Sequence, residues 1–248
     1  MMIHQDGSSH QWVPGKQWDL IVTMDDATNE HYSMFFVEEE GTWSSFKGIE
    51  DVIAKLGLFC SLYTDRATHY WNTPEAGGKV DKVNLTQFGE AMKSLRVEMI
   101  PAYSPEARGR SERAFRIHQE RLPKELAVAG IVDMANRYLS KTCMPALNTE
   151  FSHAAREEGS AFAPWVGGPL EDILCETFER IVGSDNRVRI EGLILQIPQD
   201  PHRLHYVKAK VTVRRYKDGG LSVSHGPRKL ASYRADGKEI VKKGMAVA

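Results

Sequence analysis

The order of strand-like and helix-like segments in the first 142 residues constrains the fold more than any other feature. Residues 19–26, DLIVTMDD, and 31–39, HYSMFFVEE, are apolar runs rich in β-branched and aromatic residues. The cluster Asp25-Asp26-Ala27-Thr28-Asn29, made of residues that favour turns, connects them. Two such runs joined by a turn predict an antiparallel hairpin.

Helical and extended patterns alternate after this hairpin. Thr42 is a suitable N-cap and Gly57 a suitable end for the first helix. We expect helices at 42–57, 85–95, 110–128 and 130–142, and further strands at 58–64 and 96–102. Residues 66–83, with Pro74 and Gly77-Gly78, have the composition of a loop. Three early strands, the first of them ending at Asp6, followed by this alternation predict an α/β fold with helices on both faces of a sheet.

The pattern changes in the last hundred residues. The stretch up to residue 172 is rich in Ala, Gly and Pro and has no sustained periodicity, and short strand-like pieces separated by turn signals such as Asp218-Gly219-Gly220 follow it. Short strands at close intervals are typical of a small all-β barrel. We therefore expect a core at 1–145, a linker at 146–172, a barrel domain at 173–236 and a tail at 237–248.

The bulk composition is that of an ordinary globular protein. The chain has 248 residues, of which 42% are hydrophobic and 26% charged, and its formal net charge is −1. A balanced charge gives no support for a nucleic-acid partner, because such binders are usually basic. The charge is unevenly distributed, however. Residues 107–124 hold five Arg and one Lys against two Glu.

The cysteines and apolar runs exclude several classes of protein. The three cysteines are far apart and form no CxxC motif, so neither a disulfide framework nor a zinc site is indicated. No apolar run approaches the roughly 18 residues that would span a membrane. The first residues lack the basic and then apolar layout of a signal peptide. We expect a reducing, cytoplasmic setting.

Three acidic residues stand at positions suited to metal chemistry. Asp6 and Asp65 are expected at strand ends, and Glu112 opens a basic helix. Carboxylates brought together in this way suit divalent-metal phosphoryl transfer, because hard cations prefer oxygen ligands. For the third position Glu106 and Glu120 compete with Glu112. For the first position Asp25 and Asp26 compete with Asp6, but they fit a hairpin turn better.

The motifs around these acids resemble those of a known superfamily. QDGSSHQW surrounds the first acid, YTDRATHYW the second, and PAYSPEARGRSERAFRIHQ the third. In this order, and with an antiparallel hairpin between the first two, they resemble the catalytic core of DDE transposases and retroviral integrases. That core has an RNase H-like fold, a mixed five-stranded sheet with helices on both faces. Within the superfamily the chain looks most similar to bacterial insertion-sequence transposases, many of which carry a small β-barrel after the core.

The resemblance implies a function, a cofactor and partners. Asp6, Asp65 and Glu112 would bind two Mg²⁺ or Mn²⁺ ions, and the enzyme would cleave DNA and transfer strands between element ends and target DNA. It would work as a homo-oligomer on DNA, in the bacterial cytoplasm at the nucleoid. Two other functions stay open, namely a catalytically silent DNA-binding or multimerising fragment, and an RNase H-like nuclease that only hydrolyses.

Two features depart from the family pattern. The interval from Asp65 to Glu112 is 47 positions (112 − 65), which is longer than the commonest spacing. The chain also begins five residues before Asp6, so the sequence predicts a transposase core without the N-terminal helix-turn-helix region that recognises element ends.

Basic residues near the third acid and in the barrel are candidate DNA contacts. Glu112, Arg116 and Gln119 share one helical face, so cations beside the acid could meet phosphates. In the barrel, Lys208 and Lys210 would share one face of a strand. The alternative for both groups is a solvated, charged surface. The candidates are Arg113, Arg116, Arg121, Lys124, Lys208 and Lys210.

Overall fold

The computed structural model divides the chain into two compact units, Met1–Leu174 and Cys175–Ala248, and each is described by itself. The structure describes residues 1–75, 78–103, 109–129, 134–155, 159–199 and 203–241. Within the helix at 109–129, the described side chains are those of residues 113–127.

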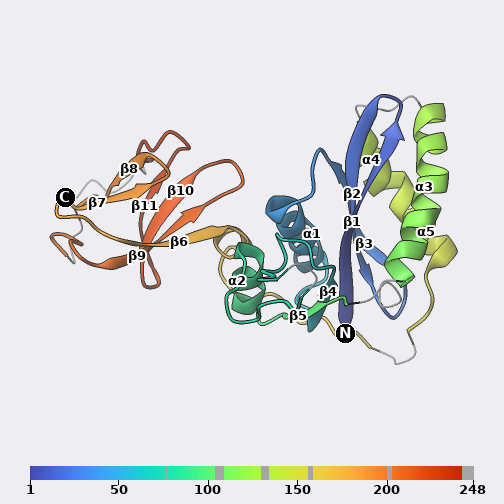
Figure 1. Ribbon diagram of the computed structural model, residues 1–248, viewed down its shortest axis with the longest axis horizontal. Coiled ribbons are helices and arrows are strands. Elements are labelled where there is room, and N and C mark those ends of the chain that lie inside the picture. Colours follow the sequence, from blue (N-terminus) through green and yellow to red (C-terminus); the bar gives the residue numbers. More distant parts are fainter. Residues whose placement is uncertain (76–77, 104–108, 130–133, 156–158, 200–202, 242–248) are drawn as a thin grey trace. The chain divides into compact units, whose positions relative to one another are not determined.

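Unit 1 is built on a mixed five-stranded sheet with the strand order β3-β2-β1-β4-β5 (Figure 1). The strands β1, β2 and β3 are antiparallel neighbours, whereas β1, β4 and β5 run parallel. The sheet confirms the α/β prediction, and the hairpin expected at 19–39 is β2 and β3. The bounds are β1 Met2–Val13, β2 Lys16–Asp25, β3 His31–Val37, β4 Ser61–Thr64 and β5 Glu98–Pro101.

Helices cover both faces of this sheet, and each face has its own hydrophobic cluster. One cluster joins α1 and α2 to the sheet, and the other joins α3, α4 and α5 to it (Figure 1). A mixed five-stranded sheet covered in this way fits the expected RNase H-like fold. The bounds are α1 Thr42–Lys55, α2 Gln87–Ser94, α3 Gly109–Ala129, α4 Ala135–Tyr138 and α5 Met144–Phe151, with a π-helix, η3, at Leu139–Cys143.

The longest strand, β1, is the first of the three predicted early strands, but it extends well beyond Asp6. We expected Asp6 at a strand end, but it lies in the middle of β1, where it pairs with Val22 of β2. Polar residues hid the full length of the strand, because their burial depends on partners that only the fold supplies. Gln5, for example, is 1% exposed. Its amide donates to Thr23 Oγ1 and to the carbonyl of Ser45 and accepts from the Tyr70 hydroxyl.

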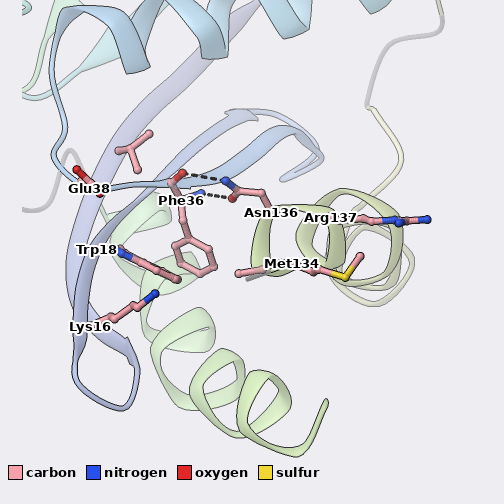
Figure 2. Close-up of a pocket in the computed structure, with 9 residues that line it drawn as sticks. Lys16, Trp18, Phe36, Glu38, Met134, Asn136 and Arg137 are labelled. Atoms are coloured by element: carbon pink, nitrogen blue, oxygen red, sulfur yellow. Dashed lines mark hydrogen bonds between the residues drawn. The ribbon is translucent and has the colours of Figure 1, made fainter. Parts of the chain in front are cut away.

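Two asparagine side chains close the outer edge of the sheet, at β3. The Asn136 amide accepts from the Phe36 N–H at 2.6 Å and donates to the Phe36 carbonyl at 3.1 Å (Figure 2). Asn148, on α5, makes the same pair of bonds with His31, at 2.8 and 2.9 Å. Each amide thus replaces a neighbouring strand and satisfies backbone groups that an edge strand leaves unpaired.

The stretch predicted as a linker, 146–172, belongs to unit 1, and it contains most of α5 and a segment that packs against other residues of that unit. Ala163 forms a β-bridge with Leu58, and the Phe162 ring lies edge-on to Tyr32 with centroids 5.6 Å apart. A 3-10 helix, η4, spans Leu170–Asp172. These apolar contacts order the segment, although its Ala-, Gly- and Pro-rich composition suggested a linker.

Unit 2 consists of short strands, as expected. They form a four-stranded sheet with the order β11-β10-β9-β6 and a separate hairpin, β7-β8. One hydrophobic cluster, which includes Val188, Val213 and Tyr233, lies between them. Closure into a barrel stays a prediction. The bounds are β6 Glu176–Ile181, β7 Arg187–Ile190, β8 Leu193–Gln196, β9 Lys210–Arg215, β10 Leu221–His225 and β11 Arg228–Tyr233.

Candidate metal-binding site

Asp6 and Asp65 come from neighbouring parallel strands in the same register. The pairing of β1 with β4 runs from Met2↔Ser61 to His4↔Tyr63. Asp6 lies two residues beyond His4, and Asp65 lies two residues beyond Tyr63. Because neighbouring strands lie about 4.8 Å apart, this register brings the two acids side by side. Asp65 follows the end of β4, as predicted.

Local hydrogen bonds hold the Asp65 carboxylate in place. Its Oδ1 accepts from the Ala67 N–H at 3.0 Å, which forms a side-chain turn after the strand. The preceding Thr64 accepts from the buried Trp71 indole at 2.9 Å and donates to the Asp65 carbonyl at 3.0 Å. Trp71 is therefore a packing residue that braces the Asp65 turn.

Asp6 lies under helix α3, the helix that carries Glu112. Asp6 is 6% exposed, and its Oδ1 accepts from the Gly7 N–H at 3.0 Å. A small recess beside it is lined by His4, Asp6, Val22, Met24, Ala114 and Phe115. One turn further along α3, the Gln119 amide donates to Ser8 Oγ at 3.0 Å. The side chain of Glu112 lies outside the described residues, although its backbone belongs to the first turn of α3.

A fourth carboxylate, which the sequence analysis missed, lies against Gly7, the neighbour of Asp6 on β1. Glu40 occupies the space that a side chain on Gly7 would fill, and its Oε1 lies 3.5 Å from His69 Nε2. The Glu40 N–H donates to Asp19 Oδ2 at 2.7 Å, which fixes the segment before α1. In sequence, Glu40 ends a run of three glutamates that looks like solvated charge, so no local signal distinguishes it.

The pKa of the Tyr70 hydroxyl reflects the negative charge of this region. Burial raises the pKa of Tyr70 well above its ordinary value of 10, and the charge of Glu40, followed by those of Asp6 and Asp65, raises it further. The charges of these three carboxylates therefore all act on the Tyr70 hydroxyl. A concentration of negative charge like this favours a bound cation.

The donor set suits a hard divalent cation, but the described side chains do not complete a metal site. Asp6 and Asp65 supply carboxylate oxygens, which Mg²⁺ and Mn²⁺ prefer. Among the described residues, no group of three or more His, Cys, Asp or Glu side chains is placed to hold a metal ion. Because the Glu112 side chain lies outside this part, the predicted triad as a whole stays a prediction.

The predicted DNA contacts on α3 fall into two groups. Arg113, Arg116 and Lys124 are exposed. Arg121 instead bonds to Glu125 Oε1 at 3.1 Å and to Glu150 Oε2 at 2.7 Å. The guanidinium of Arg121 therefore connects α3 to α5, and the carboxylates occupy donors that a phosphate would need.

In unit 2, Lys208 and Lys210 do not share a strand face. Lys208 precedes β9 and has a left-handed backbone with φ of 61°, so the period-two argument fails for this pair. Lys208 is exposed, whereas the Lys210 ammonium lies 2.6 Å from Glu179 Oε2.

The two units carry opposite net charges. Residues 1–174 contain 17 Lys and Arg against 25 Asp and Glu, a formal charge of −8 (17 − 25). Residues 175–248 contain 15 against 8, a formal charge of +7 (15 − 8). The overall charge of −1 therefore conceals a basic unit, which the bulk composition could not reveal.

A cavity of about 530 Å³ lies elsewhere in unit 1, beside the Asn136–Phe36 pair (Figure 2). Trp18, Phe36 and Met134 contribute apolar surface to it, and Lys16 and Arg137 contribute charge. Asp6 and Asp65 do not line it, so it is separate from the candidate metal-binding site.

Sequence comparison relates the chain to transposases. It is 29% identical over 230 residues to the putative transposase y4bF of Sinorhizobium fredii (strain NBRC 101917 / NGR234). The match covers 90% of this chain and 49% of that protein. It is 26% identical over 225 residues to the transposase for insertion sequence IS1202 of Streptococcus pneumoniae, covering 89% and 48%. The chain thus spans about half the length of these curated relatives. No protein-family model matches it.

Among solved structures, the chain is similar to integrases at low identity. The HTLV-2 integrase catalytic core domain in complex with magnesium is 16% identical, with a TM-score of 0.41, and the match covers 57% of this chain and 86% of that one. A chain of the simian T-cell lymphotropic virus intasome in complex with PP2A regulatory subunit B56 gamma is 15% identical, with a TM-score of 0.42, and the match covers 98% of this chain and 79% of that one.

No helix in the described part of the chain is long and apolar enough to cross a membrane.

Proposed function

Since this chain is a relative of insertion-sequence transposases within the DDE transposase and integrase superfamily, we propose that it is a metal-dependent polynucleotidyl transferase acting on DNA. It would cleave a DNA strand and then join the freed 3′-OH to target DNA. The observation that carries the proposal is the shared register of Asp6 and Asp65, with Asp6 beside α3.

Helix geometry supports Glu112 as the third carboxylate. Phe115 lies beside Asp6, and Gln119 bonds to Ser8, so α3 and β1 run in the same direction. Glu112 precedes Gln119 by seven residues, which is about 10 Å along a helix. About three residues of a strand span the same distance, so the first turn of α3 lies near the level of Asp6.

Each carboxylate has a distinct place in the proposed reaction. Asp6, on β1, would bind the metal ions between the two other carboxylates. Asp65 would bind them from the turn after β4, and Glu112 would bind them from α3. Two bound Mg²⁺ or Mn²⁺ ions would activate the attacking oxygen and stabilise the leaving oxygen of an in-line displacement. The residues themselves hold and orient these ions, and no covalent enzyme intermediate is required.

The charge distribution supports DNA as the substrate. The basic unit, residues 175–248, would contact the phosphate backbone, while the acidic unit would recruit cations to the carboxylates. We also propose that the protein acts as a homo-oligomer, because cutting and joining two element ends requires two active sites.

A nicking and strand-transfer assay tests this function. The purified chain is incubated with a labelled DNA duplex and Mn²⁺, and nicked and joined products are measured. We expect both products from the wild type and neither from Asp65→Asn. Glu90→Gln, a change to an exposed carboxylate on α2, is the matched control and should keep activity.

The other outcomes distinguish the alternatives. Nicking that survives in Asp65→Asn would exclude the proposed site. Nicking without joining would favour a nuclease that only hydrolyses. DNA binding that is equal in the wild type and Asp65→Asn, with no metal-dependent cleavage in either, would favour a silent binding fragment.

A further inference from the structure

Two buried histidines meet between the edge strand and helix α3. His31, the first residue of β3, and His118, on α3, are 5% and 1% exposed. Their Nε2 atoms lie 3.2 Å apart, and their rings are nearly perpendicular with centroids separated by 5.2 Å. This hydrogen bond connects residues that are 87 positions apart in the chain.

The Nε2–Nε2 bond joins the two rings directly. The His118 Nδ1 atom has no hydrogen-bond partner among the described residues, whereas the Asn29 backbone and the Asn148 amide also act on the His31 ring. The surroundings are the apolar cluster of α3, α4 and α5. An apolar pair would fill this space without leaving polar atoms unpaired, so packing alone does not account for two histidines.

Hydrogen bonds and packing contacts on β3 and on α3 fix the segments that carry the two histidines. The Asn148 amide bonds to the N–H and carbonyl of His31, which fixes the start of β3. On α3, Phe115 packs one turn before His118, beside Asp6, and the Gln119 amide bonds to Ser8 of β1. The pair therefore lies between the sheet edge and the part of α3 that borders the candidate metal-binding site.

We propose that His31 and His118 are positioning residues that fix the register of α3 on the sheet, and so set the distance between the helix carboxylate and the two strand carboxylates. This inference rests on the proposed function for the role of Glu112. A directional bond suits the task, because apolar side chains tolerate sliding while a slip of one residue, about 1.5 Å, would break the Nε2–Nε2 bond. Single buried polar contacts set register in other helical assemblies in the same way.

The proton state of the pair agrees with this role. Burial lowers the pKa of His31 to about 4, and burial, with the charges of His31 and Arg121, lowers the pKa of His118 to about 3. Hydrogen bonding with the Asn29 backbone and the Asn148 side chain partly opposes the shift at His31, and neither group is ionisable. Arg121 is the charged group that acts on the pair from α3 among the described residues. Both rings are therefore neutral near pH 7, when one can donate and the other accept.

Manganese binding by the chain of 248 residues tests the proposal, with free Mn²⁺ measured by electron paramagnetic resonance. We expect His118→Phe to bind Mn²⁺ at least about tenfold more weakly than the wild type, as is usual when a group that supports metal ligands is removed. His118→Gln, which can still bond to His31, should recover part of the affinity. Leu126→Ala is the matched control, because Leu126 is a fully buried α3 residue in the same cluster and makes no polar contact.

A distance measurement separates this proposal from the proposed function. Spin labels are attached to the exposed Cys60 and to Arg116→Cys on α3, because both positions are accessible. We expect the distance distribution to shift or broaden in His118→Phe and to stay narrow in Leu126→Ala, even if the wild type were to bind no Mn²⁺. An unchanged distribution in His118→Phe, or a change of equal size in Leu126→Ala, would overturn the positioning role.

Discussion

The Glu40 carboxylate lies directly against Gly7, in the space that a side chain at that position would take. Gly7 follows Asp6 on β1, so the two neighbours face opposite sides of the sheet, with Asp6 toward α3 and Gly7 toward Glu40. The glycine therefore admits a fourth carboxylate beside the strand that carries the first acid.

Gly7→Ala and Gly48→Ala should differ in their effect on stability. At Gly7 the obstacle is the end of a flexible glutamate, so we expect Glu40 to move away from His69 at a cost of less than about 1 kcal/mol. At Gly48 the obstacle is the buried Gln5 amide, which is held by three hydrogen bonds, so we expect a loss of about 1–3 kcal/mol. Urea unfolding measures both. Equal losses would contradict this account of the two close approaches.

Asn148→Ala should destabilise unit 1 by about 1–3 kcal/mol, because it leaves the N–H and carbonyl of His31 without partners. Asn148→Asp should do no better, since a carboxylate can accept from the N–H but repels the carbonyl. Thermal unfolding of both variants checks this. Thr149→Ala, an exposed neighbour on α5, should change stability by less than about 0.5 kcal/mol.

Stability should fall as pH is lowered from 7 to 5. In the folded chain the pKa values of His31 and His118 are about 4 and 3, below the ordinary 6.5, so the unfolded state binds more protons in this range. The stabilisation is therefore present above pH 6.5 and is lost toward pH 4. Each histidine contributes roughly 2 kcal/mol to the loss between pH 7 and pH 5.

The double variant His31→Phe/His118→Phe isolates this effect. Its free energy of unfolding should depend less steeply on pH between 7 and 5 than that of the wild type, because the groups that take up protons on unfolding are gone. Denaturant unfolding at several pH values gives the slopes. Parallel curves for the two proteins would show that the pair does not cause the acid sensitivity.

Lys208→Ala and Arg121→Ala should separate DNA contact from structural ion pairing. Lys208 is exposed in the basic unit, so its loss should weaken DNA binding for all sequences and reduce the salt slope by about 1. Arg121 is engaged with Glu125 and Glu150, so its loss should leave DNA affinity unchanged and cost at most about 1 kcal/mol of stability. Fluorescence anisotropy at several salt concentrations measures the affinities. A larger salt effect for Arg121→Ala would reverse the assignment.

The sequence alone predicted the elements that have a strong period. The hairpin of β2 and β3 and the helices α1, α2 and α3 follow from runs of apolar residues at strand or helix spacing. The α1 boundaries differ by one or two residues, because Gly41 rather than Thr42 is the N-cap and the helix ends at Lys55. The turn at Asp25 was also predictable, since Asp25 accepts from the N–H and hydroxyl of Thr28.

The full extent and the partners of elements whose burial depends on distant residues could not be predicted in this way. The strand β1 is central but polar, because its side chains bond to groups on β2, α1 and α3. His118 is a polar residue at a position where the helical pattern indicates an apolar one, since it lies at helical spacing between Ala114 and Leu122, which are both buried. Its partner, His31, is 87 residues away, and no local pattern connects the two.

The sequence by itself determined which residues have the chemistry for metal-assisted phosphoryl transfer, because the identities of Asp6, Asp65 and Glu112 and their order along the chain are local facts. Only the tertiary structure decided that Asp6 and Asp65 share a register, that Glu40 approaches Gly7, and that Arg121 is engaged in ion pairs. The physical reason is that side-chain chemistry is carried by each residue, whereas proximity arises from strand pairing and helix packing between segments far apart in the chain.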